Sequence, residues 1–164
     1  MKRMKKIMAL MLAAIMMMAM SVTAFAAEGA TGTLTLTVNV KTTTPAQDLK
    51  GQTINLYKLF DVTESGTTGS KNYAYTVNTE TGYKDAIKSA LGTSFSGTTD
   101  EEYAAAVLAL DSNDSTKVQN FANKFTTYAL TKSLAATATS GKIAEENKTS
   151  YTFNNLTAGY YLVY

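Results

Sequence analysis

The feature that most constrains the fold is a change of hydrophobic period along the chain. From residue 33 to 40, apolar side chains occupy every second position: Leu34, Leu36, Val38 and Val40. Such alternation predicts a half-buried β-strand. From Tyr83 to about Leu134 apolar residues recur at helical spacing, and strand-like segments return before Tyr164. This order predicts a mainly β domain with two to three helices inserted between strands.

Shorter patterns place the other elements. Residues 52–60 form a second predicted strand, with Ile54, Leu56 and Phe60 on one face. A Gly/Ser/Thr-rich turn is expected at 64–70 and a third strand at 73–77. After the helical block, β structure is expected at 142–144, 151–153 and 160–164, with a turn at 156–159.

One helix start is marked by a specific motif. Thr99 and Glu102 have the spacing of a capping box, in which each side chain bonds the other's backbone N–H. The run Asp100-Glu101-Glu102 also suggests paired carboxylates for glycoside hydrolysis. Acidic residues at a helix N-terminus explain the run without catalysis, and we favour that interpretation.

The first 26 residues have the three zones of a secretory signal peptide. A basic start is followed by an unbroken apolar run from Ile7 to Met20, and Ala24-Phe25-Ala26 matches the usual cleavage pattern. The alternative is an uncleaved membrane anchor, but the run is shorter than the ~20 apolar residues of a spanning helix. We therefore predict an exported chain that meets the membrane only during export.

Removing this segment changes the composition. Fifteen basic residues become eleven against thirteen acidic ones, so the basic balance belongs to the signal peptide and predicts no nucleic-acid partner. The chain has no Cys and no His. Cys–His nucleophiles, Ser–His triads and common zinc sites are therefore excluded. We expect no enzyme activity, catalytic residue, metal or cofactor.

Two motifs carry a resemblance to a known family. The second strand contains Tyr57-Lys58-Leu59-Phe60-Asp61-Val62, and the last segment is Leu156-Thr157-Ala158-Gly159-Tyr160-Tyr161-Leu162-Val163. Their order and spacing, after an export signal and a Thr-rich first strand, resemble the N-terminal domain of Gram-positive, isopeptide-forming fimbrial shaft subunits. These are the major pilins that sortases assemble.

The resemblance implies an immunoglobulin-like β-sandwich at 27–164. The chain stops inside the apolar segment 160–164, and because a bare apolar strand at the end of a domain is an aggregation hazard, we expect the domain to be truncated at its C-terminal end. It also implies a structural subunit of a cell-surface pilus, anchored outside the cell and serving adhesion. The implied partners are other pilin subunits and a sortase, which joins subunits covalently. The alternative is the ligand-binding domain of a secreted or wall-anchored adhesin that recognises a host or carbohydrate ligand.

The resemblance also directs attention to one lysine. An intradomain isopeptide bond requires a lysine beside an Asn or Asp in an apolar core, because burial disfavours the charged amine. Lys58 is the candidate, since the strand pattern places it on the face of Ile54, Leu56 and Phe60. We favour the alternative that Lys58 extends its ammonium group to solvent from a strand edge. In the family the reactive lysine usually lies on the first strand, where this chain offers Lys41.

Overall fold

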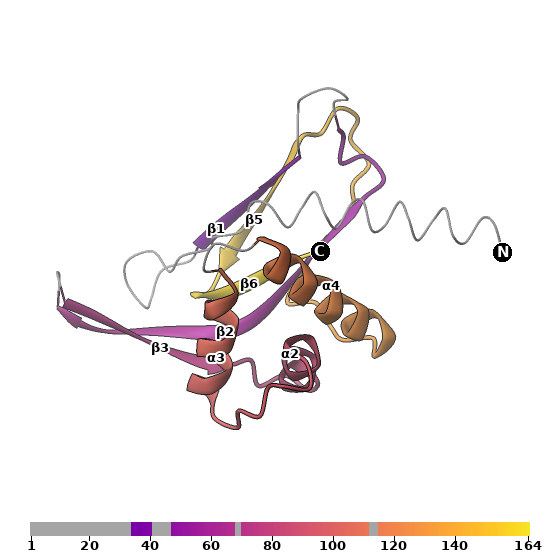
Figure 1. Ribbon diagram of the computed structural model, residues 1–164. Coiled ribbons are helices and arrows are strands. Elements are labelled where there is room, and N and C mark those ends of the chain that lie inside the picture. Colours follow the sequence, from indigo (N-terminus) through magenta and orange to yellow (C-terminus); the bar gives the residue numbers. More distant parts are fainter. Residues whose placement is uncertain (1–33, 41–46, 68–69, 112–114) are drawn as a thin grey trace.

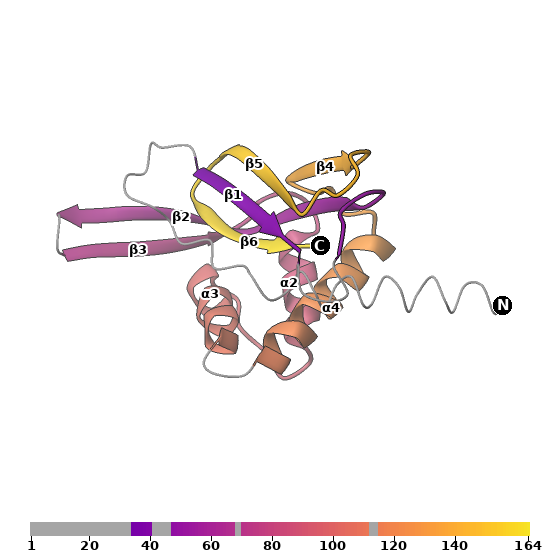
Figure 2. The same cartoon turned by 90° about the horizontal axis from the view of Figure 1, so that it is seen from above.

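The protein has three layers in the computed structural model, which describes residues 34–40, 47–67, 70–111 and 115–164. A two-stranded antiparallel sheet lies on one side of a four-stranded antiparallel sheet, and helices lie on the other side (Figure 1, Figure 2). The predicted signal peptide and Lys41 fall outside the described residues.

The strands follow the predicted order closely. The small sheet pairs β1 (Leu34–Asn39) with β5 (Ser150–Leu156). The larger sheet contains β2 (Thr53–Thr67), β3 (Ser70–Val77), β4 (Ala138–Lys142) and β6 (Gly159–Val163).

Strand β2 organises the larger sheet because the other three strands of that sheet pair with it. Leu56 lies opposite both Ala138 of β4 and Val163 of β6. Phe60 lies opposite both Val77 of β3 and Tyr160 of β6. Strands β4 and β3 therefore follow one another along one side of β2, and β6 occupies the other side.

Three α-helices connect β3 to β4, as the helical spacing predicted. They are α2 (Tyr83–Leu91), α3 (Asp100–Leu108) and α4 (Ser115–Thr131), with a 3₁₀ turn, η1 (Ala109–Asp111), after α3. The capping box is confirmed: the Glu102 N–H donates to Thr99 Oγ1 at 3.3 Å, and the Thr99 N–H donates to Glu102 Oε2 at 3.0 Å. Two backbone donors at the start of α3 are thereby satisfied.

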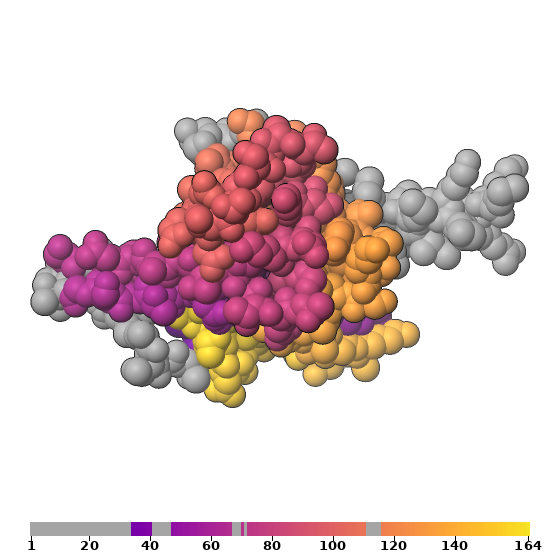
Figure 3. Space-filling view, turned by 90° about the horizontal axis from the view of Figure 1, so that it is seen from below, coloured from indigo at the N-terminus to yellow at the C-terminus, as the bar shows by residue number. Residues whose placement is uncertain are grey.

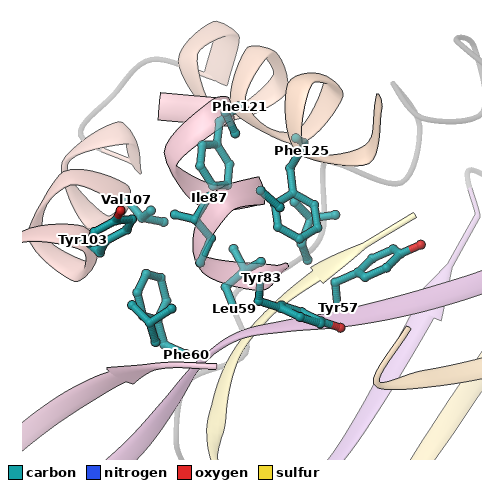
Figure 4. Close-up of a cluster of buried hydrophobic side chains, with 14 of the residues drawn as sticks. Tyr57, Leu59, Phe60, Tyr83, Ile87, Tyr103, Val107, Phe121 and Phe125 are labelled. Carbon is teal, nitrogen blue, oxygen red and sulfur yellow. The ribbon is translucent and has the colours of Figure 1, made fainter. Parts of the chain in front are cut away.

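Two apolar cores hold the layers together. The first joins the larger sheet to the helices and contains the ring contacts of Tyr57, Tyr83, Phe121 and Phe125 (Figure 4). The second lies between the two sheets and includes Val38, Ile54, Leu56, Phe153 and Val163. Burial of apolar side chains stabilises the packing of the layers in both cores, by about 25 cal/mol per Å² of apolar surface removed from water.

The predicted turn at 64–70 was too long. Strand β2 continues to Thr67 and β3 begins at Ser70, so the two strands form a long hairpin that projects from the body (Figure 3). The polar residues Glu64 and Ser65 are held in the strand by backbone pairing with Tyr73 and Asn72 rather than by burial. Backbone bonds do not depend on side-chain pattern, which is why the composition was misleading.

Candidate functional site

The candidate site is the junction where the two motif segments meet. Strand β2 carries the first motif and β6 the second, and they pair antiparallel with Lys58 opposite Tyr161 and Asp61 opposite Gly159. Residues about 100 positions apart in sequence, such as Lys58 and Thr157, therefore come into contact.

Lys58 is buried at this junction. Its side chain is 7% exposed, and its ammonium group pairs with the Asp61 carboxylate and donates to Thr157 Oγ1 at 2.6 Å. The Tyr161 ring lies beside the same ammonium group, 5.9 Å from Nζ to the ring centroid. The Tyr161 hydroxyl donates to the Thr157 carbonyl at 2.7 Å, which fixes the turn that supplies Thr157.

The expectation that Lys58 reaches solvent from a strand edge is wrong. Strand β2 has β6 on one side at this point. On the other side, Thr137 and Asn78 fill the gap between β4 and β3. The Lys58 N–H donates to Thr137 Oγ1 at 2.9 Å, and Asn78 Nδ2 donates to the Lys58 carbonyl at 2.8 Å. Two side chains thus replace the missing strand and hold Lys58 in the interior of the sheet.

A β-bulge explains how Lys58 meets Asp61. In a regular strand, residues three apart point to opposite faces. The register between β2 and β6 shifts between Lys58 and Phe60, so one extra residue enters β2 there. The bulge also moves Phe60 to the other face of the sheet. The prediction that Phe60 shares a face with Ile54 and Leu56 is therefore wrong. Phe60 packs in the core beside the helices, whereas Ile54 and Leu56 lie in the core between the sheets.

Gly159 leaves room for the lysine stem. A Cβ atom built on Gly159 would lie 2.3 Å from Lys58 Cε and 2.6 Å from the Phe60 carbonyl oxygen. Any side chain at this position would therefore collide with both the lysine and the backbone of β2. The glycine of the second motif is required by the lysine of the first.

The arrangement supplies an ion pair more readily than an amide bond. Asp61 is the one carboxylate that contacts Lys58 Nζ among the described residues. Its side chain is 51% exposed, so the apolar enclosure that an isopeptide bond requires is incomplete. Asp61, Thr157 and Gly159 were not selected as site residues from the sequence, although all three belong to the two motifs.

Two tyrosines of the core beside the helices have pKa values raised above the usual 10, further from neutral pH. Burial raises the pKa of Tyr57, and the nearby Tyr164 raises it further. Burial also raises the pKa of Tyr83, whose hydroxyl donates to the Ala135 carbonyl at 2.7 Å. Both rings remain neutral and serve packing.

Comparison with protein-family models, with curated proteins and with solved structures found no match. Within the described residues, no group of His, Cys, Asp and Glu side chains is arranged to hold a metal ion. The helices of this part of the chain are too short or too polar to span a membrane.

Proposed function

We propose that the chain is the N-terminal domain of a structural subunit of a cell-surface pilus, which a sortase joins covalently to other subunits. The observation that carries the proposal is the direct pairing of the two motif segments as β2 and β6. The two segments that carry the resemblance, about 100 positions apart in sequence, are thereby neighbours in one sheet.

The layered fold supports the same proposal. Two antiparallel sheets with an apolar core between them, and helices inserted between β3 and β4, are compatible with an immunoglobulin-like sandwich of this family. In this proposal the Lys58 cluster, which consists of Lys58, Asp61, Thr157 and Tyr161, stabilises the pairing of two strands. Its polar groups bond one another and connect β2 to β6 and to the turn before β6.

The proposal is tested on the source cells with antibodies raised against the purified chain. Wall fractions should be boiled in detergent and separated by electrophoresis. The proposal predicts a ladder of high-mass bands, because sortase-made bonds survive boiling. A single band at the mass of one subunit would contradict it, and deletion of the cell's sortase genes should collapse the ladder.

A second candidate function is ligand binding by an adhesin, and one feature favours it. An open groove of about 420 Å³ runs between α2 and α4, lined by Ser89, Asn123, Lys124, Thr127, Tyr128, Thr131 and Lys132. Threonine hydroxyls and an aromatic ring suit a carbohydrate. Binding on a glycan array that Tyr128→Ala abolishes would support this function.

A further inference from the structure

The open groove between α2 and α4 carries positive charge that no neighbouring carboxylate balances. Lys124 and Lys132 line it, and no acidic residue does. Among the described residues neither of these lysines forms an ion pair, whereas Lys84 on α2 pairs with Asp100. The sequence explains the imbalance, because residues 115–144 contain four lysines and no Asp or Glu. The groove is therefore a place where a negatively charged ligand finds unpaired cations.

The spacing of the two lysines favours an extended ligand. Lys124 and Lys132 are eight residues apart in sequence, which is about 12 Å along a helix. Lys132 follows the last residue of α4, and its N–H still donates to the Tyr128 carbonyl at 2.9 Å. The Lys124 ammonium group lies near the C-terminal end of α2, since a Cβ atom built on Gly92 would be 3.9 Å from Lys124 Nζ. A chain with repeated negative charges can meet both lysines, whereas a single small anion meets one.

The threonines of the groove specify a second property of the ligand. The Thr127 hydroxyl donates to the Asn123 carbonyl and the Thr131 hydroxyl to the Thr127 carbonyl, each at 2.7 Å. A hydroxyl has one proton and two lone pairs, so these oxygens have only acceptor capacity left for a ligand. Both threonines are exposed. A ligand that fits must bring O–H or N–H donors as well as negative charge.

We propose that the groove between α2 and α4 binds an acidic polysaccharide. Lys124 and Lys132 pair with carboxylate or sulfate groups of the sugar chain, and Thr127 and Thr131 accept hydrogen bonds from its hydroxyls. The half-buried Tyr128 ring offers an apolar surface to a sugar ring. This inference rests on the second candidate function, carbohydrate binding at the same groove, and adds the chemical class of the carbohydrate. It is independent of whether the chain assembles into a pilus.

The experiment is isothermal titration calorimetry of the purified chain with four probes. Heparin oligosaccharides carry sulfate groups, and polygalacturonate oligosaccharides carry carboxylates. Dextran supplies hydroxyls without charge, and inorganic polyphosphate supplies charge without sugar hydroxyls. We expect at least one acidic oligosaccharide to bind at least about tenfold more tightly than either dextran or polyphosphate. The preferred acidic probe identifies the acid group. Its binding should weaken as sodium chloride rises from about 0.05 M to about 0.5 M, because salt screens exposed charges.

Each contrary result has a distinct meaning. Dextran that binds as tightly as the acidic oligosaccharides would overturn the inference and leave carbohydrate binding intact. Polyphosphate that binds as tightly would show that charge alone is recognised and would also overturn it. Failure of both acidic oligosaccharides to bind would overturn it as well. If no neutral glycan bound either, carbohydrate binding at the groove would fail together with the inference.

A matched pair of double variants separates the groove from the net charge. The variant with Lys124→Gln and Lys132→Gln should weaken the acidic oligosaccharide about five- to thirtyfold, as expected when two exposed ion pairs are lost. The control carries Lys117→Gln and Lys142→Gln, which remove the same charge at exposed positions outside the groove. The control should bind within about twofold of wild type, because at physiological salt charges beyond about 8 Å are screened. Equal weakening in both double variants would contradict binding at this groove. Circular dichroism verifies that both variants fold.

Discussion

The aliphatic part of the Lys58 side chain occupies the space where a side chain at Gly159 would lie. The Lys58 ammonium group reaches the Asp61 carboxylate and the Thr157 hydroxyl. A charge in this position is stable only while its partners remain, because an unpaired buried charge loses hydration without compensation. The two members of the ion pair are unequal, since the lysine is buried and the aspartate is half exposed.

This inequality predicts different effects for removing either partner. Asp61→Asn leaves the buried ammonium group without its counter-charge and should lower the free energy of unfolding by about 1–3 kcal/mol. Lys58→Met keeps the stem, removes the buried charge and should change stability by less than about 1.5 kcal/mol. Urea denaturation measures both variants. Equal losses, or a larger loss for Lys58→Met, would show that the pair does not act in this way.

The same geometry predicts the covalent state of Lys58. We expect the intact mass of the purified chain to show no loss of water, because Asp61 is too exposed for amide formation with Lys58. Electrospray mass spectrometry decides the matter. A wild-type mass that is lower than expected by one water molecule, with no such loss in Lys58→Arg, would establish a Lys58–Asp61 isopeptide bond.

Part of this site could be predicted from the sequence and part could not. Lys58 stood out because the strand pattern places it on the same face as Ile54 and Leu56. Asp61 did not, because residues three apart on a regular strand face opposite ways. The bulge near Leu59 arises from the register between β2 and β6, a contact between distant segments that local pattern does not encode.

At the scale of elements, helix α3 begins with a cap that can be tested directly. Thr99→Ala removes the acceptor for the Glu102 N–H and should lower the free energy of unfolding by about 0.5–2 kcal/mol. Thermal denaturation followed by circular dichroism measures the change. Thr127→Ala is a matched control, because the Thr127 hydroxyl bonds within α4 to the Asn123 carbonyl and caps nothing.

The cap also predicts a pH dependence. The backbone N–H groups of Thr99 and Thr98 hold the pKa of Glu102 below its usual 4.5. A carboxyl whose pKa is lower in the folded state stabilises the fold above about pH 4.5, and the effect disappears as pH falls through the folded value. The stability difference between wild type and Glu102→Ala should therefore shrink between pH 6 and about pH 3. A difference that stays constant would exclude ionised Glu102 as the source.

The pairing of β2 with β6 depends on Gly159. Gly159→Ala should destabilise the fold by about 1–3 kcal/mol or more, because the new Cβ meets both Lys58 and the Phe60 carbonyl. Shortening the lysine relieves one contact and leaves the other. The double variant Gly159→Ala with Lys58→Ala should therefore remain destabilised relative to Lys58→Ala alone, and full recovery in urea denaturation would contradict this geometry.

The sequence predicted the helices and strands that bury one apolar face. The strand at 33–40, the three helices and the last strand appear close to their expected positions because each has an apolar face. Strand β4 was expected at 142–144 and lies at Ala138–Lys142. Its Thr, Ser and Gly residues show no alternation, and backbone bonds to β2 hold it.

At the scale of the whole molecule, β2 is the shared element of both cores. Its residues Tyr57 and Leu59 pack toward the helices, whereas Ile54 and Leu56 pack toward the small sheet. The order of strands and helices predicted a mainly β domain with inserted helices, but not which face of the larger sheet the helices cover. The position of β6 on the side of β2 away from β3 and β4 could not be predicted, because it depends on pairing between distant segments.

The central claim, that the chain is a shaft subunit of a pilus, is tested most directly by immunogold electron microscopy of the source cells. Antibodies against the purified chain should label filaments repeatedly along their whole length. Label scattered over the cell surface without filaments, or confined to filament tips, would contradict a shaft subunit and favour the adhesin.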